Sequence, residues 1–334
     1  MKTLVIGGNG FVGSAVVRAL IAHGHAVRCL LRTTSTTGRI DDLAVERVTG
    51  DIREPASLHA ALDGCDAVIH LASPSAWDQI DSPLMQAVVV DGTRNLLAAL
   101  AERRARGRVC RMVYVSTAAA VNGSERPQSF DESAAFTLDE RRFRYVACKR
   151  EAERLCGDAV GRGQPVVIVN PAEVYGPHDH GFVTAGNLLE FLRQNPVLVC
   201  AGGTSIVHVD DVALGIVRAL ERGTAGERYI LGGENLGIAE LARLCLELAG
   251  RRARIIELPR PPLRALAALG RRLALPLPFN PSVIPYATRY WYMNAAKAET
   301  ELGLRFRDAR AVLEPTIAWL RAAGHLPVRS SVIS

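Results

Sequence analysis

The stretch of sequence that decides the fold is Lys2-Thr-Leu-Val-Ile-Gly7-Gly-Asn-Gly10-Phe-Val-Gly13-Ser-Ala-Val-Val-Arg-Ala-Leu-Ile-Ala22. Residues 2–7 are a short apolar run that predicts a strand, and residues 12–22 follow a helical pattern. The glycines between them have the spacing G-x-x-G-x-x-G, which permits a tight turn and lets a diphosphate approach the backbone amides at a helix N-terminus. The motif predicts a dinucleotide site, and a purely structural turn is the alternative.

Outward from this stretch, apolar runs alternate with segments of helix length. Further strands are predicted at 26–31, 45–48, 67–71, 111–115 and 166–169, with helices at 57–63, 84–105 and 139–161. Strands that are apolar throughout and alternate with helices indicate a parallel sheet covered on both faces. The predicted fold class is therefore α/β, a doubly wound parallel sheet of the Rossmann type.

Past about residue 172 the alternation loosens. Asp210 and Asp211 are expected to cap a helix, a strand is expected at 228–232 and an amphipathic helix at 240–250, whereas residues 258–292 are rich in Pro, Leu, Ala and Arg. We predict a discontinuous dinucleotide-binding domain and a smaller, mostly helical, substrate-binding domain. The first covers residues 1–172 and 206–235, and the second covers 173–205 and 236–330.

The composition excludes several classes of protein. The chain has 334 residues, 49% of them hydrophobic, and a net charge of +6, which suits a large buried core. It lacks an integral membrane segment and a signal-peptide pattern, so a cytoplasmic location is expected. Three of the 40 basic residues are lysines, and the other 37, all arginines, are scattered, which argues against nucleic-acid binding. The seven cysteines contain no C-x-x-C pair and are read as reduced thiols.

The end of the second predicted strand distinguishes between two cofactors. An NAD site usually carries an acidic residue there, which accepts the ribose 2′-hydroxyl. This chain has Arg32-Thr-Thr-Ser35 and no acid until Asp41. Because Arg32 and the neighbouring hydroxyls can hold a 2′-phosphate, NADP(H) is preferred over NAD(H). The alternative is that Arg32 stacks on adenine in an NAD enzyme.

A tyrosine and a lysine, Tyr145 and Lys149, are spaced four residues apart on a predicted helix and so share one face. A neighbouring cation lowers the pKa of a phenol and makes it a usable proton donor and acceptor. This spacing also arises by chance, but Lys149 is one of only three lysines. The strand 111–115 ends in Ser116-Thr117, which supplies hydroxyls at the edge of the sheet where ligands bind.

These elements, in this order, resemble the extended short-chain dehydrogenase/reductase superfamily, the NAD-dependent epimerase/dehydratase family. The chain is most similar to the dihydroflavonol-reductase-like branch, which includes 3β-hydroxysteroid dehydrogenase relatives and hopanoid-associated epimerases. The motifs beyond the glycine loop are Gly50-Asp51-Ile52, His70-Leu-Ala-Ser73, Asp91-Gly-Thr-Arg-Asn95, Val115-Ser-Thr117, Tyr145-x-x-x-Lys149, Asn170-Pro171, Tyr175-Gly-Pro177, Val207-His-Val-Asp-Asp211 and Arg228-Tyr-Ile-Leu-Gly-Gly-Glu-Asn235.

The resemblance implies a role for each matching residue. Tyr145 is the acid/base, Lys149 binds the nicotinamide ribose and lowers the pKa of the phenol, and Thr117 steadies the substrate carbonyl. The implied cofactor-binding residues are Gly7, Gly10, Phe11, Val12, Gly13, Arg32, Asp51, Ile52, Leu71, Ala72, Ser73, Ser116, Tyr145, Lys149, Asn170 and Pro171.

Departures from the family pattern narrow the chemistry. Val89 replaces a usual asparagine, which puts an asparagine-dependent proton relay in doubt. Asn170 replaces a frequent arginine, as in the reductase-like branch. Thr117 is followed by three alanines where sugar-nucleotide 4,6-dehydratases carry Asp-Glu, so that elimination chemistry is not expected. Ser205 stands where many sugar-nucleotide enzymes have arginine, which argues against such a substrate.

The predicted function is an NAD(P)H-dependent oxidoreductase that transfers hydride between nicotinamide and a ketone or secondary alcohol on a small apolar or cyclic substrate. The alternative is a sugar or sugar-nucleotide epimerase that uses the same three side chains by transient oxidation. A third hypothesis, a non-catalytic dinucleotide sensor, predicts lost catalytic residues, whereas all three are present.

Several residues are candidates for binding the substrate, and each has an alternative interpretation. The candidate substrate-binding residues are Ser73, Trp77, Thr117, Glu173, His178 and Trp291, and the alternative is that these residues belong to the core, a hinge or a solvated loop. His178-Asp-His180 has no evident third ligand, so no metal is expected. For residues 261–286 three interpretations are open: they cover an apolar substrate, they touch a membrane surface, or they pack on their own domain. The long helices predicted at 84–105 and 139–161 resemble a four-helix dimer seam, so a homodimer is expected.

Overall fold

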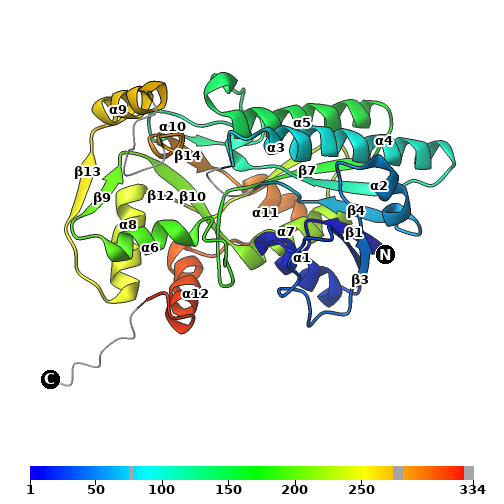
Figure 1. Cartoon of the computed structure of the whole chain (residues 1–334), viewed down its shortest axis with the longest axis horizontal. Helices are drawn as coiled ribbons and strands as arrows, with labels where there is room; N and C mark the ends of the chain where they lie inside the picture. The colour runs from blue at the N-terminus through cyan, green and yellow to red at the C-terminus, as the bar shows by residue number, and fades with distance from the viewer. Residues whose placement is uncertain (75–78, 274–280, 327–334) are drawn as a thin grey trace.

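The computed structural model describes residues 1–74, 79–273 and 281–326. Within these ranges, seven parallel strands form one sheet in the order β11-β7-β5-β4-β1-β2-β3 (Figure 1). The order reverses beside β1, which creates the crevice in which such sheets bind ligands. The strands are β1 (Lys2–Ile6), β2 (Ala26–Leu31), β3 (Glu46–Thr49), β4 (Ala67–His70), β5 (Arg111–Val115), β7 (Val166–Pro171) and β11 (Arg228–Leu231).

Helices cover both faces of this sheet (Figure 1), and each layer of helices has its own apolar core against it. One face carries α1 (Phe11–Ala22), α7 (Val209–Arg222) and α11 (Ala296–Leu302). The other carries α2 (Pro55–Leu62), α4 (Gly92–Ala105) and α5 (Arg144–Gly161). Because each strand is sandwiched, both of its faces are apolar, and the predicted doubly wound α/β fold is confirmed.

Two predicted helices have different boundaries in the structure. The helix expected at 84–105 consists of α3 (Pro83–Met85), a π-helical stretch (Gln86–Asp91) and α4. The helix expected at 139–161 is wrong at its start, because residues Glu140–Arg142 form a separate 3-10 turn capped by the Asp139 side chain. Phe143 then leaves helical geometry and its ring is fully buried, so α5 begins at Arg144. Tyr145 consequently lies in the first turn of α5.

The C-terminal lobe combines helices with small sheets. Its core is formed by α6 (Ala185–Arg193), α8 (Ile238–Ala249) and α12 (Ala309–Ala322), as the predicted helical character requires. Short strands that the sequence pattern did not reveal add a five-stranded sheet and a two-stranded sheet among the described residues. These are β6 (Ser129–Phe130), β8 (Glu173–Tyr175), β9 (Val197–Cys200), β10 (Gly203–His208), β12 (Glu234–Gly237), β13 (Ile255–Leu258) and β14 (Tyr290–Met293).

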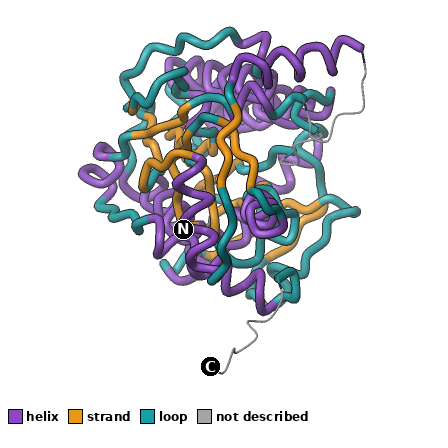
Figure 2. Tube along the Cα trace, turned by 90° about the vertical axis from the view of Figure 1, so that its left-hand side faces the viewer, coloured by secondary structure: helices purple, strands orange, loops and turns teal. Residues whose placement is uncertain are grey.

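The connection between the two lobes runs through β10, which contains the predicted domain boundary at 205/206. Figure 2 shows strands running through the middle of the molecule with helices around them. His208 ends β10 and is the N-cap of α7, its ring nitrogen accepting the amide of Asp210 at 3.2 Å. Asp210 and Asp211 lie in the first turn of α7, but the N-cap is His208 and not either of them, and Asp211 accepts the backbone amide of Arg307.

Two further findings concern the chain as a whole. The seven cysteines are free, and six of them are buried. Of the described helices, none combines the length and apolar character needed to cross a bilayer.

Candidate active site

The turn between β1 and α1 is shaped for close approach of a ligand. Gly7 has φ of 93°, and its carbonyl accepts the amide of Gly10 at 3.1 Å. A Cβ on Gly13 would lie 2.0 Å from the Gly7 carbonyl oxygen, and a Cβ on Gly7 would lie 3.0 Å from the Ala72 nitrogen. Only glycine fits at these two positions. Gly10, the N-cap of α1, offers no side chain to its amides, which leaves them for an anionic ligand.

The predicted site residues at the carboxyl ends of three strands lie along one edge of the sheet. The strand registers pair Ile6 with His70, and Val115 with Val169. The Leu71 amide continues this pairing by donating to the Ile6 carbonyl at 2.9 Å. The carboxyl ends of the strands therefore stand level, and the residues that follow them border the crevice beside the glycine turn. Leu71, Ala72, Ser73, Ser116 and Thr117 follow β4 and β5, and Asn170 and Pro171 are the last two residues of β7.

Tyr145, Lys149 and Thr117 converge at this edge. The Lys149 ammonium is 3% exposed and donates to the Val115 carbonyl at 2.9 Å, which fixes α5 to the end of β5. The Thr117 hydroxyl is hydrogen-bonded to the Tyr145 phenol, and it also accepts the Ala119 amide at 3.4 Å. A phenol and a buried ammonium from α5 and a hydroxyl from the segment after β5 are thus held together.

Burial perturbs the protonation of both ionisable groups. It raises the pKa of the Tyr145 phenol, and the hydrogen bond with Thr117 acts in the opposite direction. Burial lowers the pKa of Lys149 to about 8, while the nearby Glu153 carboxylate opposes that shift. In this structure Thr117 lowers the phenol's pKa, and the same effect expected of Lys149 stays a prediction. Perturbed groups gathered in one crevice are typical of a functional site.

A buried polar network supports these side chains from behind. The Asn170 side-chain amide donates to the Thr117 carbonyl at 2.9 Å and to the Glu153 carboxylate at 2.8 Å. Arg228 reaches the same carboxylate at 3.5 Å. The Ser116 hydroxyl and the Asn170 side-chain oxygen are buried without a hydrogen-bond partner among the described residues. Buried polar atoms without a partner can bind a polar ligand. Both this edge and the glycine turn therefore fit a nicotinamide dinucleotide.

The far end of the crevice is formed by residues that follow β2 and β3. The Arg32 amide donates to the Ser35 hydroxyl at 3.0 Å, which orders the loop after β2. Asp51 pairs with Arg53 at 2.6 Å, and this pairing lowers the pKa of its carboxyl. Ile52 is 4% exposed and packs in the core, so its side chain serves the fold.

Sequence reasoning missed Arg39 in the same loop. Its guanidinium donates to the Asn9 carbonyl of the glycine turn at 3.4 Å and to the His178 carbonyl at 3.2 Å. Arg39 therefore ties the loop after β2 to the glycine turn and to the C-terminal lobe. The sequence signal that could have found Arg39 is that it lies in the same basic, hydroxyl-rich loop as Arg32.

The candidate substrate residues differ in what they contact. Trp291 packs edge-on against Phe143 at 6.0 Å between ring centroids, and it lies in the same apolar cluster as Tyr145. The Ser73 hydroxyl donates to the Pro74 carbonyl at 3.1 Å. The Glu173 carboxylate is engaged within its own lobe by the Tyr175 hydroxyl and the Asn187 amide. Trp77 lies outside the described residues.

His178 and His180 belong to a ring cluster around Trp319. His180 meets Trp319 edge-on at 5.3 Å, and the two histidine rings are 6.0 Å apart. Asp179 between them accepts the amides of residues 183, 184 and 185 at the start of α6, which is a structural role. Across the described ranges, no group of three or more His, Cys, Asp or Glu side chains could hold a metal ion.

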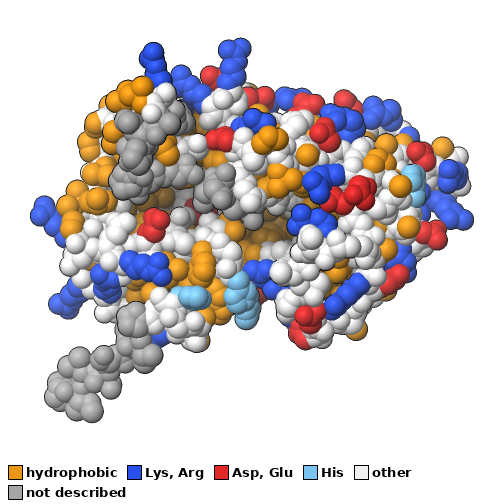
Figure 3. All heavy atoms as spheres, viewed as in Figure 1, with side chains coloured by type: hydrophobic (Ala, Val, Ile, Leu, Met, Phe, Trp, Pro, Cys, Tyr) orange, Lys and Arg blue, Asp and Glu red, His pale blue; other side chains and the backbone are white. Residues whose placement is uncertain are grey.

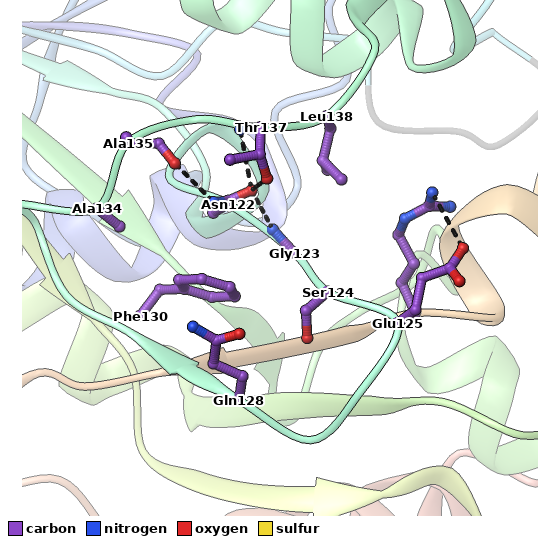
Figure 4. Close-up of a pocket in the computed structure, with 11 residues that line it drawn as sticks. Asn122, Gly123, Ser124, Glu125, Gln128, Phe130, Ala134, Ala135, Thr137 and Leu138 are labelled. Carbon is purple, nitrogen blue, oxygen red and sulfur yellow. Dashed lines mark hydrogen bonds and ion pairs between the residues drawn. The ribbon is translucent and has the colours of Figure 1, made fainter.

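A hollow of about 500 Å³ lies on the segment that follows Thr117 (Figure 4). Asn122 braces it from one side by donating to the Ala135 carbonyl and accepting from Thr137. Leu138 lines the hollow and also packs in the apolar cluster of Trp291. Neither Tyr145 nor Lys149 lines it, so it borders the active-site cluster without being the reaction site.

Comparison with known proteins decides the family. The family model described as "NAD dependent epimerase/dehydratase family" matches residues 3–232. The chain belongs to this family. Membership confirms the resemblance stated above, and it makes the protein an NAD(P)-dependent enzyme of the oxidoreductase type. The residues that the model matches include the glycine turn and all three converging side chains.

The names of similar proteins include a ketoreductase, a sterol demethylase protein and a sugar epimerase. The chain is 33% identical over 278 residues to 4-hydroxy-2-methyl-3-oxo-4-farnesyl-3,4-dihydroquinoline-1-oxide ketoreductase of Stigmatella aurantiaca, covering 82% of this chain and 80% of that protein. It is 31% identical over 338 residues to sterol demethylase protein B of Methylococcus capsulatus, covering 97% and 99%. A nucleoside-diphosphate-sugar epimerase of Pseudomonas aeruginosa superposes with a TM-score of 0.80 and 28% identity, covering 98% and 99%.

Proposed function

We propose that this enzyme is an NADPH-preferring carbonyl reductase that acts on an apolar cyclic ketone and runs in reverse as an alcohol dehydrogenase. The observation that carries the proposal is the convergence of Tyr145, Thr117 and Lys149 at the sheet edge, next to the glycine turn. A phenol kept protonated by burial is suited to donate a proton at neutral pH.

The catalytic step follows from the roles of these side chains. The nicotinamide, when bound, supplies the hydride that the carbonyl carbon receives. Thr117 positions the carbonyl oxygen by hydrogen bonding, and the Tyr145 hydroxyl donates its proton to that oxygen, which leaves a phenolate. The Lys149 ammonium, one helical turn away, stabilises the phenolate electrostatically. Hydride and proton together convert the ketone into a secondary alcohol.

The residues proposed to bind the dinucleotide divide along the crevice. Gly7, Gly10 and Gly13 with the first amides of α1 hold the diphosphate, and Ser116 with Asn170 lies at the nicotinamide end. The loop after β2 carries two arginines and five hydroxyl side chains between residues 32 and 39, without a carboxylate. That chemistry favours the 2′-phosphate of NADP(H) over the 2′-hydroxyl of NAD(H).

The proposed substrate class rests on the character of the candidate walls. Trp291, partly exposed and backed by the buried Phe143 and Tyr286, provides aromatic surface beside Tyr145. The farnesylated quinoline ketone in the name of the Stigmatella relative and the sterol in that of the Methylococcus relative are both apolar and cyclic. We therefore assign the substrate to the apolar cyclic ketones.

The deciding experiment follows the absorbance of NADPH with purified enzyme and a panel of cyclic ketones and sugar nucleotides. We expect stoichiometric NADPH consumption with an apolar cyclic ketone, and loss of turnover by about a thousandfold in Tyr145→Phe. Retention of full turnover by that variant, or turnover of sugar nucleotides alone, would overturn the proposal.

The second candidate is a sugar epimerase, which the similarity to the Pseudomonas epimerase favours. It would use the same side chains to oxidise a hydroxyl and reduce it again from the opposite face. An epimerase interconverts two substrates without net change in cofactor absorbance, so the same assay with product analysis separates the two functions.

The expected oligomer is a homodimer built on α4 and α5. Both helices are long and lie on the same face of the sheet. Sedimentation equilibrium with the intact chain would test this, and a monomeric mass across micromolar concentrations would refute it.

A further inference from the structure

Helix α9 (Arg260–Leu273) presents an apolar face to the outside of the C-terminal lobe. Leu266, Leu269 and Leu273 are 43%, 48% and 56% exposed. They are spaced three and four residues apart, so they share one side of the helix. We name these three residues the α9 leucine face.

The exposed leucines are not required to hold α9 in place. Leu263 and Ala267 lie on a different side of the helix, where they are buried with Ile284 against Cys200 and Leu258 of the β9–β13 sheet. Leu198 of β9 is also 49% exposed. Figure 3 shows hydrophobic side chains gathered over α9 and the strands beside it, at the upper left of the view. The lobe thus offers an apolar surface beyond what its own packing needs.

The positive charge of the sequence is concentrated in the stretch that contains α9. Residues 251–292 contain eight arginines and a single acidic residue, Glu257, a net charge of +7. The whole chain carries +6, so the remainder has a net charge of −1. Arg252, Arg254 and Arg272 are exposed. Part of the charge is neutralised within the lobe, since Arg264 and Arg289 pair with Glu125.

We propose that the α9 leucine face, with the exposed Arg272 of the same helix, docks on a membrane surface that contains anionic lipid. A short amphipathic helix binds an interface when its apolar side chains enter the acyl boundary and its arginines meet anionic headgroups. A second copy of this chain would place the same arginines opposite one another, so the charge pattern fits anionic lipid better than self-association.

The test is co-sedimentation of the full-length enzyme with vesicles of phosphatidylcholine alone and with vesicles containing phosphatidylglycerol. We expect binding to the anionic vesicles that weakens as salt is raised, and little binding to the neutral ones. The variant Leu266→Glu/Leu269→Glu should bind the anionic vesicles at least about tenfold more weakly, because each substitution removes apolar area and adds a like charge. Val109→Glu is the matched control, since Val109 is 59% exposed in the other lobe.

The possible outcomes separate this surface from its alternatives. Unaltered circular dichroism and thermal midpoint in the double variant would show that lost binding is not lost folding. Absence of wild-type binding to anionic vesicles, or equal binding by the double variant, would overturn the proposal. So would a change from dimer to monomer in the double variant without vesicle binding, because the face would then join two copies. None of these measurements depends on the catalytic activity proposed above.

Discussion

The two lobes of this enzyme present their candidate site residues in opposite states. At the edge of the seven-stranded sheet, Ser116 and Asn170 hold buried polar atoms without partners, and glycines keep the turn at β1 open. In the C-terminal lobe, Glu173 is engaged by Tyr175 and Asn187, and the Trp291 ring nitrogen donates to the Tyr286 carbonyl. The sheet edge is suited to bind a ligand, the cofactor, whereas the candidate residues of the C-terminal lobe already have partners within that lobe.

The largest effect should come from filling the glycine turn. Gly13→Ala would place a Cβ 2.0 Å from the Gly7 carbonyl oxygen, which forces the turn to move. We expect the affinity for NADPH to fall by at least about a hundredfold, because the amides of α1 lose their alignment. Isothermal titration calorimetry measures this directly.

Gly24→Ala is a useful comparison, because Gly24 also lies in a turn but has open space around it. Its φ of 77° predicts a loss of stability without a specific loss of NADPH affinity. Equal NADPH affinity in the wild type and in Gly13→Ala would mean that the glycine turn does not bind the diphosphate.

The second prediction concerns the loop after β2. Arg32→Ala should weaken NADPH binding by about tenfold and leave NADH binding nearly unchanged, because the lost charge-assisted bonds involve only the 2′-phosphate. Arg39→Ala is expected to weaken both cofactors, since Arg39 contacts the glycine turn. If Arg32→Ala reduced NADPH and NADH affinity equally, Arg32 would be stacking on adenine instead.

How much of this site the sequence predicted depends on the kind of contact. Gly7, Gly13 and the strand ends were predictable, because turn geometry and strand alternation are local and parallel strands bring their ends to one edge. The start of α5 was misplaced, since it depends on burial of Phe143 against Tyr286 and Trp291 from the distant end of the chain. Arg39 was missed because its partners, the Asn9 and His178 carbonyls, are set by tertiary packing.

The third prediction separates the two aromatic walls of the C-terminal lobe. Trp291→Phe should raise the KM for the ketone about threefold to tenfold with the NADPH affinity unchanged, because Trp291 shares an apolar cluster with Tyr145. Trp319→Phe, a matched change in the ring cluster of His178 and His180, should leave the KM unaltered. The reverse pattern would move the substrate to the His178 side of the crevice.

The smallest effect concerns Glu153, a charged group on α5 that acts through Lys149 of the same helix. Lys149 has a pKa lowered to about 8 by burial, and Glu153 raises it toward the usual value. Since only the protonated ammonium stabilises the phenolate, reductase activity should hold steady below about pH 8 and decline above it.

Glu153→Gln removes the negative charge, so it should lower the pKa of Lys149 and move this decline to lower pH by about half a unit to one unit. Glu151→Gln, an exposed carboxylate on the same helix that pairs with Arg154, is the control and should leave the profile in place. The pH dependence of kcat/KM measures both. A lower rate at every pH, with the profile in the same place, would contradict this prediction. It would show that Glu153 only holds Asn170 in position through their hydrogen bond and does not set the pKa of Lys149.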